Sequence, residues 1–196
     1  GLGDVYKRQA MVAMVKALES RAQDSASKDT ARRTGDDTSP VKMGLIGYGP
    51  RGREIAKSLA QLPSAPLVAV CDNYGAMLRR AKREAPKAKG YEDYQDLLKD
   101  KNVEGVIVAT APHDHKQIVL AALKAGKHVY CEKPLAHSVH EVRALMAEAR
   151  KQKVVTQLGN QGHSSGDIRK CVEWIRDGAI GKVHTVHAAC GAVHTR

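Results

Sequence analysis

From Val41 onward the chain alternates between short apolar runs and longer amphipathic segments, and this alternation limits the folds it can adopt. The apolar runs have the length of strands and cover residues 41–47, 67–71, 105–109, 128–131 and 154–158. The segments between them have a helical pattern and cover residues 52–61, 76–85, 94–99, 115–125 and 139–151. Strands that alternate with helices are typical of βαβ units. We therefore expect an α/β fold, a doubly wound parallel sheet with helices on both faces.

Composition agrees with a sheet buried between helices. Hydrophobic residues make up 42% of the 196-residue chain, while aromatic residues make up only 4% and Phe is absent. The core must therefore consist mainly of Val, Ile, Leu and Ala, which suits parallel strands covered on both faces. Gly126 follows the fourth helical segment and is expected to end it.

The formal net charge of +11 raises the question of nucleic-acid binding. Its densest patch, residues 79–89, alternates with Ala and is interpreted as the solvated face of a helix. Interleaved aromatic residues and known nucleic-acid motifs are absent, so we expect no nucleic-acid partner. No apolar run approaches the roughly 20 residues that cross a bilayer, so no membrane partner is expected either.

Cysteine usage favours a reducing compartment. The four cysteines have no CxxC spacing, and Cys71 and Cys131 lie in apolar, strand-like runs. Buried reduced thiols in a cytoplasmic protein are the expectation. His113, Asp114 and His115 stand together, but no further cluster stands at a suggestive spacing, so no metal site is predicted.

Three regions differ in character. Residues 1–40 include a stretch rich in Ser, Thr, Asp and Arg without periodicity, and are interpreted as a disordered or non-native extension. Residues 41–160 carry the strand–helix alternation and are expected to form one domain. Residues 161–196 are expected to hold a linker helix at 166–176 and a strand at 182–189 that begins a second, α+β domain.

A glycine-rich turn follows the first apolar run and reads Gly47-Tyr48-Gly49-Pro50-Arg51-Gly52. It fits the pattern G-x-G-x-x-G, and it opens an amphipathic helix, as a dinucleotide-binding loop requires. In such a loop Gly47 permits the tight turn, Gly49 lets the backbone approach a pyrophosphate, and Gly52 allows close packing of helix on strand. The helix N-terminus then presents amides to the phosphates.

An acidic residue follows the second apolar run at the spacing expected of a ribose ligand. Asp72, followed by Asn73, lies 20 residues after Gly52. A carboxylate there accepts hydrogen bonds from both ribose hydroxyls and repels a 2′-phosphate. No Lys or Arg follows immediately, and Arg79 and Arg80 lie about two helical turns further on. The pattern favours NAD over NADP; a role for Asp72 as a helix N-cap is compatible with it.

Three further segments, together with the glycine turn, carry a family resemblance. They read Ala109-Thr110-Ala111-Pro112-His113-Asp114-His115, Ala125-Gly126-Lys127-His128-Val129-Tyr130-Cys131-Glu132-Lys133-Pro134-Leu135 and Gly159-Asn160-Gln161-Gly162-His163. Over residues 41–196 the chain resembles the Gfo/Idh/MocA family, named for glucose–fructose oxidoreductase and inositol dehydrogenase. Glu-Lys-Pro after a strand, preceded by Ala-Gly-Lys-His-Val, is the most specific of these elements.

The resemblance assigns a catalytic role to Lys133, beside the nicotinamide and the reacting carbinol. An ammonium group there can hydrogen-bond the substrate oxygen and stabilise charge as hydride leaves. Independently of the family, a Lys before Pro at a strand end can reach the crevice of a doubly wound sheet. Glu132 is carried over as a residue of the cofactor pocket.

Other positions are implied by the resemblance as contacts to the dinucleotide. Thr110, Ala111, Pro112 and His115 match the loop after the fourth strand of the family. Many relatives place Pro directly after the Thr, whereas Ala111 intervenes here, which puts the role of Pro112 in doubt. Asn160 and Gln161 match residues near the nicotinamide amide, with a plain loop as the alternative.

In that family a second domain completes the substrate site. It is an open, mostly antiparallel sheet that makes the oligomer contact and supplies an Asp-x-x-x-His pair whose His is the acid/base. No such pair follows Lys182. We therefore expect this chain to bind dinucleotide without turnover, and the full-length protein to be a homo-oligomer.

The leading hypothesis is hydride transfer between NAD(P) and a sugar or polyol-like alcohol. Two alternatives remain open because relatives share this first domain. One is a glycosidase that uses NAD transiently, by oxidation, elimination and reduction back; net release of NADH separates it from a dehydrogenase. The other is a dinucleotide-sensing regulator, against which the retained Lys133 argues.

Overall fold

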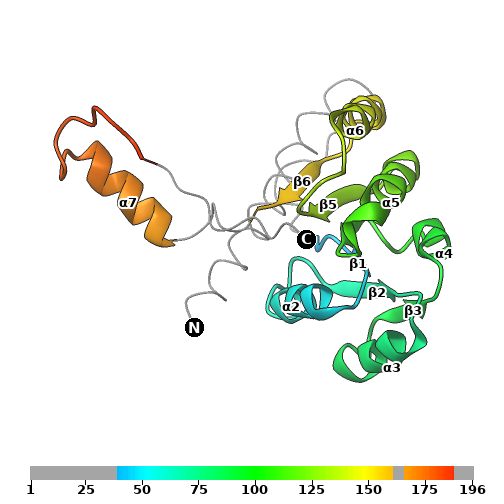
Figure 1. The fold of residues 1–196 in the computed structure, drawn as a ribbon. Helices are drawn as coiled ribbons and strands as arrows, with labels where there is room; N and C mark the ends of the chain where they lie inside the picture. The colour runs from blue at the N-terminus through cyan, green and yellow to red at the C-terminus, as the bar shows by residue number, and fades with distance from the viewer. Residues whose placement is uncertain (1–38, 161–165, 188–196) are drawn as a thin grey trace, which may run out of the picture.

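The computed structural model describes residues 39–160 and 166–187. Six parallel strands form one sheet in the order β3-β2-β1-β4-β5-β6 (Figure 1). Their bounds are β1 Met43–Ile46, β2 Leu67–Cys71, β3 Lys89–Tyr91, β4 Gly105–Val108, β5 His128–Glu132 and β6 Thr156–Gly159. This is the strand order of a doubly wound dinucleotide-binding fold, with its topological switch between β1 and β4. The expected fold class is confirmed.

Helices connect successive strands, as right-handed crossovers between parallel strands require. They are α2 Pro50–Leu59, α3 Gly75–Glu84, α4 Tyr94–Lys99, α5 Pro112–Lys124 and α6 Val139–Gln152, followed by α7 Gly166–Arg176. Side chains cap two of them, because Asp93 accepts from the amide of Gln95 and Ser138 accepts from that of Glu141. Gly126, with φ of +69°, ends α5 as expected.

Successive residues of the central strands point to opposite faces and build two cores. Leu45, Val70, Ile107 and Tyr130 pack with α2 on one face. Their neighbours Ile46, Cys71, Val108 and Cys131 pack with α4, α5 and α6 on the other. Because the strands are covered on both faces, they are apolar throughout rather than alternating with polar residues. The expected burial of Cys71 and Cys131 is confirmed.

Two differences from the sequence-based expectations concern strands. Strand β3 was not predicted, because Lys89–Tyr91 carries no apolar run and forms only by pairing with β2. The strand predicted at 182–189 is wrong for its described part, since residues 182–187 have no regular structure. Alternating side chains can favour a strand, but a strand forms only with a neighbour to share its hydrogen bonds. No described segment pairs with these residues.

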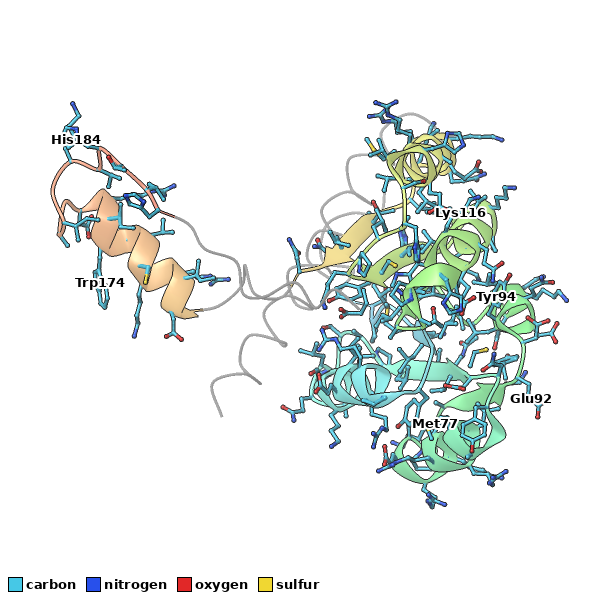
Figure 2. All side chains as sticks on the ribbon, in the orientation of Figure 1. Met77, Glu92, Tyr94, Lys116, Trp174 and His184 are labelled. Carbon is cyan, nitrogen blue, oxygen red and sulfur yellow. The ribbon has the colours of Figure 1, made fainter. Side chains whose placement is uncertain are left out.

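The remaining surface features are simple. The basic patch at 79–89 lies on α3 and the segment after it; its Lys and Arg side chains are exposed or half-exposed, as expected of a solvated face, while Ala81 between them is buried. No residue of α7 is buried, and Trp174, labelled in Figure 2, is 60% exposed.

None of the helices among the described residues combines the length and apolarity that crossing a membrane requires. The predicted extension falls almost wholly at residues 1–38, outside the described part.

Candidate functional site

A cleft of about 750 Å³ opens at the carboxyl ends of β1, β2 and β4, where the strand order reverses. Its volume is typical of a small-molecule site. Eight residues predicted as cofactor contacts line it: Gly47, Gly49, Pro50, Arg51, Asp72, Asn73, Thr110 and Ala111. Residues as far apart in sequence as Gly47 and Ala111 are thus brought together at one sheet edge.

The three glycines of the turn are constrained in different ways. Gly47 has φ of +95°, and a Cβ there would lie 2.6 Å from the carbonyl oxygen of Ala109. A Cβ on Gly52 would collide with the carbonyl oxygen of Gly47. Gly49, the N-cap of α2, has no atom within 4 Å of the position of a Cβ. The first and last glycines therefore shape the turn, and the middle one leaves room for a ligand at the helix N-terminus.

Tyr48, between the first two glycines, turns its side chain away from the cleft. The ring is 1% exposed within the core that includes α2, and its hydroxyl donates to Glu84 at 3.2 Å. Burial, with the charge of Glu84, raises the pKa of Tyr48 to about 12. Only the backbone of Tyr48 is left to contact a ligand in the cleft.

The carboxylate of Asp72 joins the second strand to the glycine turn. Its Oδ2 accepts from the backbone N–H of Tyr48 at 2.7 Å, and its Oδ1 accepts from that of Tyr74 at 2.9 Å. A carboxylate has about four acceptor positions, so two remain for ribose hydroxyls. Asp72 therefore shapes the loop and also faces the cleft.

Sequence reasoning missed an acidic wall of the cleft. Glu92 and Asp93, from the turn after β3, and Asp114, in the first turn of α5, also line it. Glu92 and Tyr94 are labelled in Figure 2; Tyr94 is the first residue of α4, and Glu92 precedes that helix. No motif marked Glu92 and Asp93, because they reach the cleft only through the pairing of β3 with β2. Asp114 stands in a segment that carries the family resemblance, but it was not predicted to line the cleft. Together with Asp72 they make this part of the cleft acidic.

Arg51 does not act as an unpaired cation on the turn. Its Nε and Nη2 donate to Glu132 Oε1 at 2.8 and 2.6 Å, and its Nη1 donates to Glu54 at 3.0 Å. Burial by itself lowers the pKa of the guanidinium, but hydrogen bonds and charge from Glu132 outweigh it and raise that pKa. The charge of Arg51 is thus balanced by two carboxylates.

Residues of the loop after β4 divide between the cleft and the interior. Thr110 and Ala111 line the cleft, and Pro112 is the first residue of α5. His115 lies beneath, 1% exposed, with its ring nitrogens near two carbonyl oxygens. It is not among the residues that line the cleft.

Glu132, Lys133 and Asn160 extend the same sheet edge beyond the cleft. Glu132 ends β5 and is 5% exposed, whereas the next residue, Lys133, is exposed. Asn160 follows β6 directly and is exposed. Gln161 lies outside the described residues. Among the described residues no group of three or more His, Cys, Asp or Glu is arranged to hold a metal ion.

The arrangement suits an elongated anionic ligand. Helix α2 offers amides at an open glycine, β2 offers a carboxylate with free acceptor positions, and the edge continues past β4 to Lys133. In doubly wound sheets a dinucleotide lies across this crevice. The open space at Gly49 shows that the turn fits a pyrophosphate.

Comparison with known proteins agrees with this geometry. The family model GFO_IDH_MocA, described as an oxidoreductase family with an NAD-binding Rossmann fold, matches residues 41–160. A myo-inositol 2-dehydrogenase of Thermotoga maritima is 33% identical over 146 residues, which are 74% of this chain and 44% of that protein. A mouse trans-1,2-dihydrobenzene-1,2-diol dehydrogenase is 33% identical over 156 residues, 77% of this chain and 46% of the relative.

Solved structures give the same result. Scyllo-inositol dehydrogenase from Lactobacillus casei, with bound NAD(H) and scyllo-inositol, superposes with a TM-score of 0.68 at 26% identity. The match covers 72% of this chain and 42% of that one, so the chain spans less than half the length of these relatives. The chain belongs to the Gfo/Idh/MocA family of oxidoreductases with an NAD-binding Rossmann fold.

Proposed function

We propose that residues 41–160 form the dinucleotide-binding domain of a dehydrogenase and that the domain prefers NAD to NADP. The acidic cleft carries this proposal. Asp72 lines the cleft with acceptor positions to spare, and Glu92, Asp93 and Asp114 add negative charge around it. A 2′-phosphate among four carboxylates would be repelled, whereas the ribose hydroxyls of NAD can donate to Asp72.

The proposed reaction is hydride transfer between the nicotinamide and a sugar or polyol-like alcohol. The cofactor supplies the hydride acceptor or donor. Lys133, exposed at the end of β5, would hydrogen-bond the alcohol oxygen and stabilise negative charge as it develops. Asn160 and Gln161 are proposed to contact the nicotinamide amide, and Thr110, Ala111 and Pro112 the middle of the dinucleotide.

The substrate class rests on the relatives. Several are named as inositol dehydrogenases, and the bound scyllo-inositol of one solved relative is a polyol. Because this chain spans less than half of their length, the remaining substrate contacts and the acid/base group are proposed to come from a second domain. Residues 161–196 are proposed to lead into that domain, and the complete protein is proposed to be a cytoplasmic homo-oligomer.

A titration with reduced cofactors tests the cofactor preference. The expected result is an increase in nicotinamide fluorescence with NADH at concentrations at least about tenfold below those needed with NADPH. Asp72→Ala should weaken NADH binding and reduce the preference, while the matched change Asp100→Ala, at an acidic residue outside the cleft, should leave the preference unchanged. Equal binding of both cofactors by the unaltered chain, or a preference unchanged by Asp72→Ala, would contradict the proposal.

A further inference from the structure

Lys133 lies between two buried polar anchors, and neither anchor lines the cleft. The residue before it, Glu132, is 5% exposed. The residue after it, Pro134, is exposed, but its carbonyl oxygen contacts His115, which is 1% exposed. A flexible exposed lysine on a loop would ordinarily sample many positions. Here the backbone on both sides of it is held.

The first anchor is the carboxylate of Glu132. Its Oε1 accepts three hydrogen bonds, two from Arg51 at 2.8 and 2.6 Å and one from the hydroxyl of Tyr130 at 3.3 Å. Arg51 belongs to the glycine turn, 81 residues earlier. Hydrogen bonds between ions that are largely shielded from water are among the strong ones. This anchor ties the start of the Lys133 segment to the turn.

The second anchor is the imidazole of His115, on the first turn of α5. Its Nδ1 lies 2.7 Å from the carbonyl oxygen of Pro134, and its Nε2 lies 3.2 Å from that of Thr110. A carbonyl oxygen only accepts, so each ring nitrogen must donate to make its bond. The shorter contact assigns an N–H to Nδ1. His115 therefore links the end of the Lys133 segment to the first turn of α5.

We propose that His115 is a positioning residue, which holds Lys133 in place for the nicotinamide by donating from Nδ1 to the Pro134 carbonyl. The proposal rests on the role of Lys133 in the proposed function. His115 itself does not line the cleft, so it acts through the backbone rather than on the reacting atoms. This differs from a direct contact between His115 and the dinucleotide.

Two substitutions separate this role from simple filling of space. His115→Asn places its amide N–H near the position of Nδ1 and keeps the donor to Pro134. His115→Ala removes the donor. His113→Asn is the matched control, because His113 lies on the same helix with its side chain 72% exposed. All three variants are made in the 196-residue chain.

The measurement follows the Lys133 ammonium directly. Lysines are reductively dimethylated with ¹³C-formaldehyde and a borohydride reagent. The ¹³C NMR signal of the methyl groups on Lys133 is identified by its absence from Lys133→Arg. Saturating NADH should shift this signal in the unaltered chain, in His113→Asn and in His115→Asn. In His115→Ala the shift should fall to less than about half, while the dissociation constant for NADH changes by less than about threefold.

The outcomes distinguish this inference from the function on which it rests. If NADH binds the unaltered chain without moving the Lys133 signal, the role of Lys133 is overturned, and the inference with it. If the signal responds in His115→Ala as fully as in the unaltered chain, only the positioning role is overturned. If His115→Ala fails to fold, His115→Asn decides: a folded Asn variant that binds NADH without the response overturns the assignment to the Pro134 bond.

Discussion

The carbonyl oxygen of Gly47 occupies the space that a side-chain carbon on Gly52 would need. Five residues apart, the two glycines close the turn on itself and seat the first turn of α2 against the end of β1. Gly49, between them, faces open space. The same motif therefore contains two glycines that the fold requires and one, Gly49, that packing leaves unconstrained.

Substituting these glycines should separate stability from binding. Gly52→Ala should lower the free energy of unfolding by about 2–3 kcal/mol or more, because backbone rather than a flexible side chain must move. Gly49→Ala should change it by less than about 1 kcal/mol, since its Cβ meets nothing. Yet Gly49→Ala should weaken NADH binding at least about tenfold, by keeping the pyrophosphate from the amides. Urea unfolding and fluorescence titration measure the two effects; a Gly49→Ala variant that binds normally would contradict the assignment.

Asp72 should contribute to stability as well as to cofactor choice. Asp72→Ala leaves the N–H groups of Tyr48 and Tyr74 without their acceptor and should cost about 1–3 kcal/mol. Asp72→Asn keeps one acceptor oxygen and should cost less. Urea unfolding of both variants without cofactor provides the measurement. Equal losses for the two would show that the hydrogen bonds to the turn do not stabilise the fold.

Acid should destabilise the domain partly through His128. Its Nδ1 accepts from the backbone N–H of Val155 at 3.0 Å, and burial lowers its pKa below the ordinary value, against a smaller opposing effect of the charge on Glu104. Because the folded-state pKa is the lower one, protons bind the unfolded chain first. The contribution of neutral His128 to the free energy of unfolding is present above about pH 6.5, and it is lost as the pH falls through the folded-state pKa.

His128→Asn provides the test, because Asn can accept from Val155 without titrating. Between about pH 7.5 and 5 the free energy of unfolding should fall less steeply in the variant. The difference should reach about 1.4 kcal/mol for each pH unit that separates the two pKa values. If the free energy of unfolding falls equally steeply with pH in the variant and in the unaltered chain, His128 is not a source of the acid destabilisation.

Lys153 ends α6 in the left-handed conformation, with φ of 54° and ψ of 31°. This conformation costs a residue with a Cβ about 1 kcal/mol. Lys153→Gly should therefore stabilise the chain by about 0.5–1 kcal/mol, after the greater freedom of Gly in the unfolded chain is subtracted. Lys153→Ala retains the Cβ and is the control, with no comparable gain expected. Thermal unfolding measures both, and an equal gain in the Ala variant would point to the charge rather than the backbone.

Much of the fold was predictable because its signals are local. The five apolar runs and the helices between them follow from residues close in sequence, and the predicted bounds agree with the structure to within a few residues. The glycine turn was predictable for the same reason, since Gly47 and Gly52 constrain each other within six residues. Strand β3 was not, because Lys89–Tyr91 has no apolar pattern of its own.

The strand–helix alternation, the glycine turn and the acid after β2 could be predicted from the residues alone, because short-range periodicity and backbone sterics decide these features. Which distant groups meet depends on how the whole domain packs. The acidic wall of Glu92 and Asp93 depends on β3 pairing with β2, and the contact of Arg51 with Glu132 spans 81 residues. Such contacts follow from the strand order and from packing of the buried faces, and no local pattern along the chain encodes them.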